Sequence, residues 1–184
     1  AAVDTAIAGV ESASGGIDIL VNNAGIQIRA PFTEFPRSEW DRMIATNLSS
    51  VFYVSQAVAK GMVARKRGKI INIGSVMCEL GRPSIIPYTA TKGAIKMMTR
   101  GMCAELGKHN IQVNAIGPGY IVTELNKALL ADATSDGWVK ARTPAGRWGE
   151  TDELIGAAVF LASSASNFVN GHLLMVDGGM TSVV

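Results

Sequence analysis

The chain has 184 residues, a formal net charge of +2 and 48% hydrophobic residues. This length suits one domain with a substantial core, and the near-neutral charge creates no field directed at nucleic acid or an anionic membrane. We interpret the basic run at 64–69 as a solvated helix end, and no apolar run approaches the roughly 18 residues of a membrane-spanning helix.

The chain's thiols and imidazoles do not form a ligand pattern. Cys78 and Cys103 have no CxxC spacing, and His109 and His172 have no partner at metal-ligand spacing. We therefore expect no metal site. Two isolated thiols suit a reducing compartment, so we expect the protein to be cytoplasmic.

The predicted elements alternate along the chain. A first helical segment ends at Gly15-Gly16, and apolar strands are expected at 17–21, 69–73, 111–116 and 173–177. Helices are expected at about 38–65, around 86–102, within 123–148 and at 152–163. This alternation predicts parallel βαβ units with both sheet faces covered, in a single α/β domain over residues 1–184.

Three strand ends carry small or polar residues. Asn22-Asn23-Ala24-Gly25 follows the first strand, Gly74-Ser75 the second and Pro118-Gly119 the third. Each of these alone could be ordinary turn chemistry. Because ligands bind at the carboxyl ends of the strands in such sheets, the three ends together predict a cleft.

Tyr88 and Lys92 lie four residues apart in a helical stretch whose apolar residues Ile95, Met98 and Met102 predict one buried face. A phenol with a pKa of ~10 is a poor base near neutral pH, and a cation one helical turn away would lower that pKa. The spacing alone carries little weight, since a surface ion couple could share it. Ser75 before the tyrosine and the Asn-Asn-Ala-Gly turn make a chance match improbable.

Several motifs resemble the short-chain dehydrogenase/reductase family over the whole chain. They are DILVNNAG (18–25), TNLSSVF (46–52), INIGS (71–75), YTATK (88–92), IQVNAIGPGYIVTE (111–124) and VDGGM (176–180). The resemblance implies a Rossmann-like, doubly wound parallel sheet of seven strands and NAD or NADP as cofactor. The family's glycine-rich phosphate turn is absent, so we interpret the chain as the last four strands, missing its N-terminal part. We expect this chain alone to be inactive and poorly stable, because the strand at 17–21 would lack a neighbour.

The resemblance also implies the roles of the site residues. Tyr88 would be the acid/base, Lys92 would tune it and bind the nicotinamide ribose, and Ser75 would hydrogen-bond the reacting oxygen. Asn47 would mark a helix irregularity whose backbone holds a water linking Lys92 to solvent. The alternatives are a simple turn serine and a tolerated surface asparagine. The remaining implied cofactor contacts are Asn23, Ala24 and Gly25 on the adenosine side, and Pro118, Gly119, Ile121 and Thr123 on the nicotinamide side.

The stretches at 25–36, 79–88, 142–150 and 167–180 resemble family members that oxidise a secondary alcohol of a sugar acid to a ketone. An anionic substrate requires a fixed cation, and Arg29 and Arg82 are the candidates, although each could be a surface arginine. One alternative is a 3-oxoacyl-[acyl-carrier-protein] reductase, with Arg65, Arg67 and Lys108 docking the acidic carrier. An alternative of another class is a non-catalytic dinucleotide-binding module.

The resemblance further implies a homotetramer built as a dimer of dimers. The pairing helices would be the long helix at 38–65 and the helix of Tyr88. The residues expected to face outward from them are Val51, Val54, Val58, Met97 and Gly101.

Overall fold

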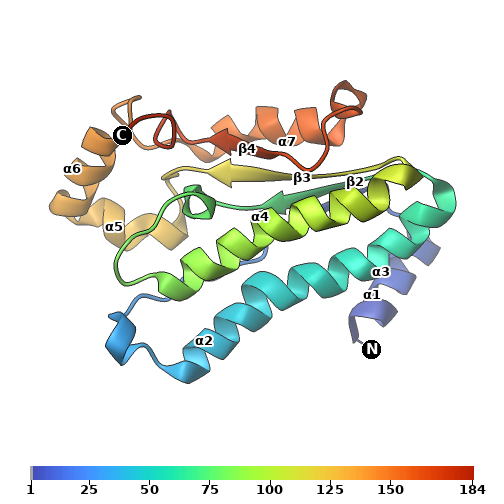
Figure 1. The fold of residues 1–184 in the computed structure, drawn as a ribbon, viewed down its shortest axis with the longest axis horizontal. Coiled ribbons are helices and arrows are strands. Elements are labelled where there is room, and N and C mark those ends of the chain that lie inside the picture. The colour runs from blue at the N-terminus through green and yellow to red at the C-terminus, as the bar shows by residue number, and fades with distance from the viewer. Residues whose placement is uncertain (1) are drawn as a thin grey trace.

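The computed structural model describes residues 2–184, in which four strands form one parallel sheet in the order β1-β2-β3-β4 (Figure 1). The strands are β1 (Ile19–Asn22), β2 (Gly68–Ile73), β3 (Ile111–Pro118) and β4 (Leu173–Val176). Every neighbouring pair is parallel, so the carboxyl ends of all four strands lie toward one edge. The predicted α/β class and the four predicted strands are confirmed.

The helices occupy the predicted intervals. They are α1 (Ala2–Ser14), α2 (Arg37–Ile44), α3 (Ser50–Arg65), α4 (Ile86–Leu106), α5 (Lys127–Ala131), α6 (Ala133–Arg142) and α7 (Ile155–Ala162). A π-helical turn, η2 (Ala45–Ser49), joins α2 to α3, so the helix predicted at about 38–65 is continuous but irregular.

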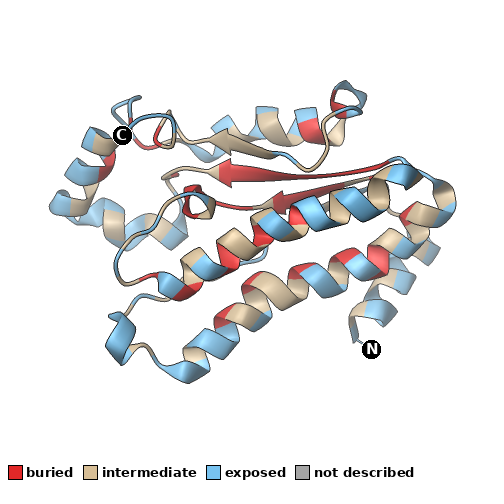
Figure 2. Ribbon diagram, in the orientation of Figure 1, coloured by how far each residue is buried: buried red, intermediate tan, exposed pale blue. Residues whose placement is uncertain are grey.

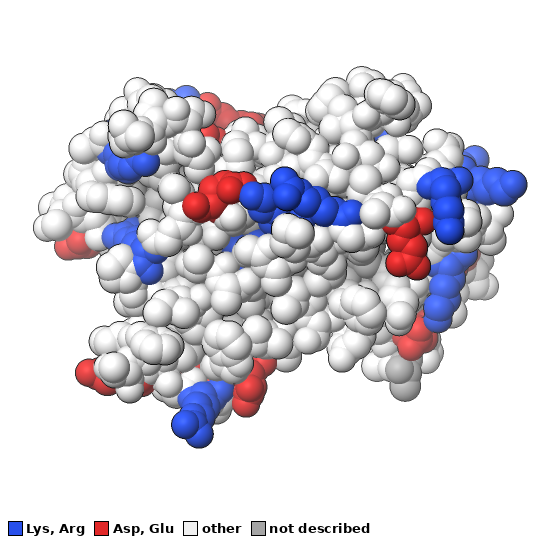
Figure 3. All heavy atoms as spheres, in the orientation of Figure 1, with Lys and Arg blue, Asp and Glu red and all other residues white. Residues whose placement is uncertain are grey.

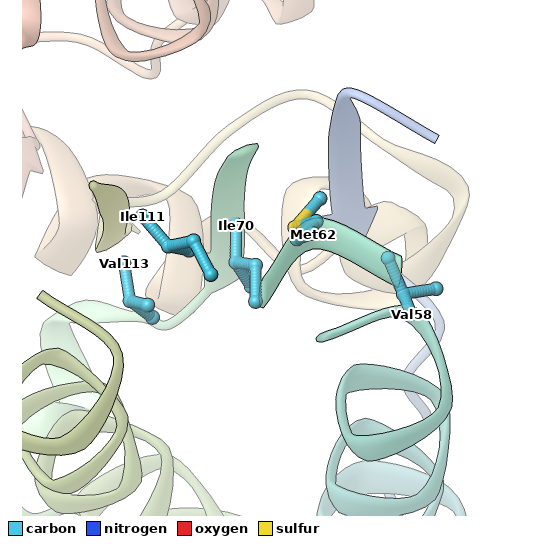
Figure 4. Packing of buried hydrophobic residues seen from close by; sticks show 5 residues of the cluster. All are labelled: Val58, Met62, Ile70, Ile111 and Val113. Atoms are coloured by element: carbon cyan, nitrogen blue, oxygen red, sulfur yellow. The ribbon is translucent and has the colours of Figure 1, made fainter. Parts of the chain in front are cut away.

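The helices cover both faces of the sheet (Figure 1). On one face, Val58 and Met62 of α3 pack with Ile70 of β2 and with Ile111 and Val113 of β3 (Figure 4). On the other face, Leu161 of α7 packs with Ile71 and Ile116. Figure 2 shows β2 and β3 as the most buried elements, as expected for strands covered on both sides.

The buried stripe of α4 differs from the prediction. Ile95 is buried, but Met98 and Met102 are only partly buried, and the other buried residues of this helix include Thr91, Lys92 and Thr99. Thr99 Oγ1 accepts a 2.9 Å hydrogen bond from Asn72 of β2. Hydrogen-bonded polar groups can be buried as well as apolar ones. The spacing of the apolar residues therefore predicted the buried face of α4 only in part.

The residues predicted to face outward from α3 also need correction. Val51 and Val58 are buried in the core of the chain itself and Val54 packs partly against it, whereas Met97 and Gly101 of α4 are exposed. The outward apolar side chains of α3 are instead Phe52 and Tyr53, each about half exposed. The valines that we expected to contact a partner subunit are therefore packed inside the chain's own core.

Charged residues of both signs are dispersed over the face shown in Figure 3, and a largely uncharged expanse covers α3 and part of α4. In the basic run at 64–69, Arg65 Nη2 donates to the Ile17 carbonyl at 2.7 Å and Arg67 pairs with Asp18 at 3.0 Å. These contacts match the interpretation of this run as a helix end. None of the helices in the described part of the chain combines the length and apolarity needed to cross a membrane.

Gly119 allows a close approach between two strand ends, and we expect its replacement to destabilise the fold. A Cβ at this position would lie 2.7 Å from Asp177 Cα, and Asp177 is fixed because its carboxylate accepts from the backbone of Gly179 and Thr181. Gly119→Ala should lower the free energy of unfolding in urea by about 1–3 kcal/mol.

The matched control is Gly9→Ala in α1, where a Cβ would meet nothing within 4 Å. That variant should be neutral or more stable by up to about 1 kcal/mol, because alanine favours the helix. A Gly119→Ala protein as stable as wild type would contradict the close-contact argument.

Candidate active site

The carboxyl ends of β1, β2 and β3 open into a cleft of about 230 Å³. Its walls bring together most of the residues predicted from the sequence, although these residues come from four separate parts of the chain. The predicted residues that line it are Asn23, Gly25, Ser75, Tyr88, Lys92, Pro118, Gly119, Ile121 and Thr123. Ala24 instead lines a neighbouring hollow of about 200 Å³ beside β1 and the start of α3.

A smaller cavity of about 50 Å³ adjoins this cleft and shares Ser75, Tyr88 and Gly119 with it. Arg29 contributes to the smaller cavity, whereas Arg82 does not line it. Sequence reasoning assigned no role to several residues of these walls, although two of them lie within stretches that it singled out. They are Gln27, Tyr120, Leu125 and Asn126.

Ser75 combines a turn role with access to the cavity. It caps the short 3-10 turn at 76–78, where its Oγ accepts a hydrogen bond from Met77 N at 3.1 Å. The alternative reading of a turn serine is therefore correct, but it does not exclude a second role. The hydroxyl also hydrogen-bonds to the Tyr88 phenol, which favours the phenolate.

The electrostatics of Tyr88 correct the argument from spacing. Burial raises the pKa of the Tyr88 phenol, while the hydrogen bond from Ser75 and the charge of Arg29 lower it by less. The expected net lowering by Lys92 is therefore wrong for this structure. The Lys92 ammonium lies 5.6 Å from the centre of the Tyr88 ring, and it donates to the Ile73 carbonyl at 2.7 Å.

Lys92 is itself an unusual buried cation. The residue is only 6% exposed, and burial lowers the pKa of its ammonium to about 8. Since water cannot surround the group, the protein supplies the Ile73 carbonyl at the end of β2 in its place. The ammonium is thereby fixed at the cleft wall one helical turn after Tyr88.

Asn47 lies in the π-helical turn and is 2% exposed. Its carboxamide makes two 2.8 Å hydrogen bonds to the backbone of Ile26, accepting from the N–H and donating to the carbonyl. It also donates to Thr91 Oγ1 of α4 at 3.4 Å. The predicted helix irregularity is confirmed, and the alternative of a surface asparagine is wrong.

The two candidate arginines have different surroundings. Arg29 is exposed as a residue, yet partial enclosure of its guanidinium lowers its pKa, and the nearby charge of Arg82 lowers it further. The Arg82 guanidinium donates to the Tyr120 hydroxyl at 2.8 Å. Among residues 2–184, no carboxylate forms an ion pair with either arginine. One positive charge, that of Arg29, thus lies on the wall of the smaller cavity, and the charge of Arg82 lies close enough to act on it.

Two of the basic residues considered for carrier docking have partners away from the cleft. Arg65 and Arg67 of the proposed carrier-docking surface pair with Glu11 and Asp18, at 3.5 and 3.0 Å. In the described part of the chain, no group of three or more His, Cys, Asp and Glu side chains could hold a metal ion.

Comparisons with known proteins agree on one family. A family model described as enoyl-(acyl carrier protein) reductase matches residues 1–181. The chain is 62% identical over 182 residues to the 5-keto-D-gluconate 5-reductase of Escherichia coli (strain K12). The matched region covers 99% of this chain and 72% of the relative. It is 57% identical over 180 residues to the gluconate 5-dehydrogenase of Gluconobacter oxydans (strain 621H), with coverage of 98% and 70%.

A solved structure is similar over the same span. It is a gluconate 5-dehydrogenase from Burkholderia cenocepacia J2315 in complex with NADP and tartrate. The two chains are 58% identical with a TM-score of 0.98, over 99% of this chain and 71% of the other.

The buried Lys92 ammonium predicts a pH dependence of stability. Its pKa is about 8 in the folded chain against an ordinary 10.5, so below pH 8 both states carry the proton and the cost of burial is fully present. Between pH 8 and 10.5 only the unfolded chain binds the proton, so stability rises with pH. Relative to Lys92→Met, wild type should therefore gain up to about 3 kcal/mol across this interval.

Urea unfolding of both proteins at several pH values measures this difference, and the methionine variant removes the titrating group while keeping most of the volume. The prediction is contradicted if the difference in free energy of unfolding between the two proteins stays constant, or shifts in favour of Lys92→Met, as the pH rises. Either result would show that burial does not lower the pKa of the ammonium.

Proposed function

The chain belongs to the short-chain dehydrogenase/reductase family, and on that premise we propose that it is an NAD(P)-dependent oxidoreductase that interconverts gluconate and 5-ketogluconate. The observation that carries this proposal is the meeting of the Ser75 hydroxyl, the Tyr88 phenol and the Lys92 ammonium on one cleft, beside an arginine without an acidic partner. The activities of the gluconate and ketogluconate relatives support the substrate class.

Tyr88 is the acid/base of the proposed reaction. In alcohol oxidation its oxygen takes the hydroxyl proton, and in ketone reduction it returns that proton to the carbonyl oxygen. Ser75 donates a hydrogen bond to the same substrate oxygen. Because burial raises the pKa of Tyr88, oxidation should accelerate as the pH rises above neutrality, when more phenolate is present.

Lys92 and Asn47 support the acid/base. The Lys92 ammonium stabilises negative charge at the cleft wall and hydrogen-bonds the nicotinamide ribose. Asn47 holds the Ile26 backbone and so fixes the turn at 22–25 beside the ammonium. The π-helical turn would also hold the water that links Lys92 to solvent.

We propose that the cleft takes the nicotinamide-ribose portion of NAD or NADP. A Cβ at Gly25 would lie 4.0 Å from Lys92 Nζ, so a larger residue here would project beside the ammonium. When bound, the dinucleotide accepts or supplies the hydride at its nicotinamide ring. The NADP bound to the similar structure supports this cofactor class. The residues proposed to contact it are Asn23, Ala24, Gly25, Tyr88, Lys92, Pro118, Gly119, Ile121 and Thr123.

The substrate carboxylate is proposed to bind on the side of the smaller cavity. Arg29 lines that cavity, where its Nη2 donates to Gln27 Oε1 at 3.2 Å, and it has no carboxylate partner among the described residues. Its remaining N–H groups are available to a substrate carboxylate. Arg82 adds a second positive charge nearby. Reduction of acyl groups on a carrier protein has weaker support, since Arg65 and Arg67 are already paired with acids of the same chain.

The protein is further proposed to act as a cytoplasmic homotetramer, a dimer of dimers that pairs through α3 and α4. A groove of about 480 Å³ runs between these helices, with Phe52, Val63 and Met102 on its walls. The largely uncharged surface over α3 and part of α4 supports this assembly (Figure 3), and Lys60 and Glu105 are the charged residues on the walls of the groove.

Tyr88→Phe should abolish nearly all gluconate oxidation in the natural gene product that contains this chain, because only the ionisable oxygen is lost. Turnover should fall below about a tenth of wild type while the dissociation constant of the dinucleotide stays almost unchanged. Lys92→Ala should impair both quantities. Tyr53→Phe on the exposed face of α3 is the matched control and should retain wild-type turnover. More than a tenth of the wild-type rate in Tyr88→Phe would refute the assignment.

Sedimentation velocity measures the proposed assembly in the same protein. Phe52→Asp should shift the tetramer toward smaller species, because a carboxylate would be buried in the groove between α3 and α4. Phe32→Asp, at a more exposed aromatic outside this groove, should leave the tetramer intact. A monomeric wild type would contradict the proposal.

A further inference from the structure

Arg82 links two segments of the chain beside the smaller cavity, although it does not line that cavity itself. It lies in the loop before α4, and its guanidinium carbon is 4.7 Å from the ring centre of Trp138 on α6. Its Nη1 donates to the Tyr120 hydroxyl at 2.8 Å, and the Tyr120 and Trp138 rings meet edge to face at 5.8 Å. We call Arg82, Tyr120 and Trp138 the clamp.

The segment that the clamp holds has little core of its own. Helix α5 has no buried residue, and Val139 is the buried residue of α6. Just before α5, Leu125 and Asn126 line both the cleft and the smaller cavity. The start of the 124–142 segment is therefore part of both cavity walls, and few buried residues anchor the two helices that follow it.

The other attachments of α6 lie on different sides. Trp148 Nε1 donates to Asp136 at 2.8 Å, and Arg142 donates to the Val183 carbonyl at 3.0 Å. These bonds join α6 to the segments that follow it in the chain. Arg82 instead joins α6 to the loop that leads into the Tyr88 helix.

The clamp is also linked to Arg29. The backbone N–H of Ala30 donates to the Ser84 carbonyl at 3.1 Å, so the loop of Arg29 is fastened to the loop of Arg82. The described residues place no carboxylate on Arg82, and a cation over an aromatic face contributes about 0.5–2 kcal/mol depending on its exposure to water. The rings of Tyr120 and Trp138 are thus the partners of the Arg82 guanidinium, where an ion pair would have a carboxylate.

We propose that Arg82 is a positioning residue that holds the 124–142 segment closed over the substrate cavity through Trp138 and Tyr120. Substrate binding then requires the clamp, whereas dinucleotide binding does not. Arg82 acts through α6 and leaves the substrate carboxylate to Arg29. The substrate part of this inference rests on the proposed function, but closure of the segment does not.

Two readouts test the clamp in the natural gene product that contains this chain. Arg82→Ala and Trp138→Ala should each raise the KM for gluconate about five- to twentyfold, with a smaller change in kcat and an unchanged dissociation constant for the dinucleotide. Because the two side chains act as one unit, the double variant should not exceed the larger single effect by more than about twofold.

The second readout is limited trypsin digestion at Lys127, Lys140 and Arg142, which needs no substrate. Cleavage there should accelerate several-fold in both variants, since the opened segment is accessible. Trp40→Ala on α2, where the residue is 40% exposed compared with 43% for Trp138, is the matched control and should change neither readout. If wild type does not oxidise gluconate, the proposed function fails while the digestion still tests the clamp.

Three results would overturn the inference. In the first, Arg82→Ala raises KM while Trp138→Ala does not, which would mean that Arg82 contacts the substrate directly. In the second, the effects of the two substitutions multiply in the double variant. In the third, trypsin cleaves both variants at the wild-type rate. Should Trp138→Ala fail to fold, Trp138→Leu keeps the apolar bulk without a π face and carries the same expectations.

Discussion

The carboxamide of Asn47 uses both of its ends on a single residue, accepting from the Ile26 N–H and donating to the Ile26 carbonyl. This pair of bonds requires the asparagine to point inward from a helix, and the π-helical turn at 45–49 provides that orientation. The loop after β1, the long helix pair α2–α3 and, through Thr91, the helix α4 are thereby held together. The cleft depends on these bonds, since the loop after β1 and the helix α4 form two of its walls.

A chain of hydrogen-bonded polar side chains also links the sheet to α4. Asn22 of β1 donates to Asn72 of β2 at 2.8 Å, and Asn72 donates to Thr99 of α4 at 2.9 Å. Lys92 donates to the end of β2 from the same helix. Each bond satisfies a group that would otherwise be costly to bury, so α4 is fixed against the sheet in one orientation. The geometry of the cleft and the specificity of the fold are supported by the same contacts.

The substrate side is built differently. The cleft wall is formed largely by strand ends and α4, whereas Leu125 and Asn126 of the smaller cavity lead into the short helices α5 and α6, which have little buried surface. Arg82 and the rings of Tyr120 and Trp138 attach α6, and such contacts can open without disturbing the core. A rigid catalytic side and an adjustable substrate side suit a family whose members act on many alcohols with one chemistry.

The sequence by itself determined the strands, the helices and the residues that meet at the cleft, because period, strand-end chemistry and the Ser-Tyr-Lys spacing are local properties of the chain. Tertiary structure alone decided which valines of α3 are buried and which face of α4 packs on the sheet. It also decided the direction of the Tyr88 pKa shift, since burial outweighs nearby charge there. The partners of Arg82 were equally hidden, because Tyr120 and Trp138 lie 38 and 56 positions further along the chain. Burial and long-range contact depend on how distant elements pack, and spacing along the chain carries little information about either.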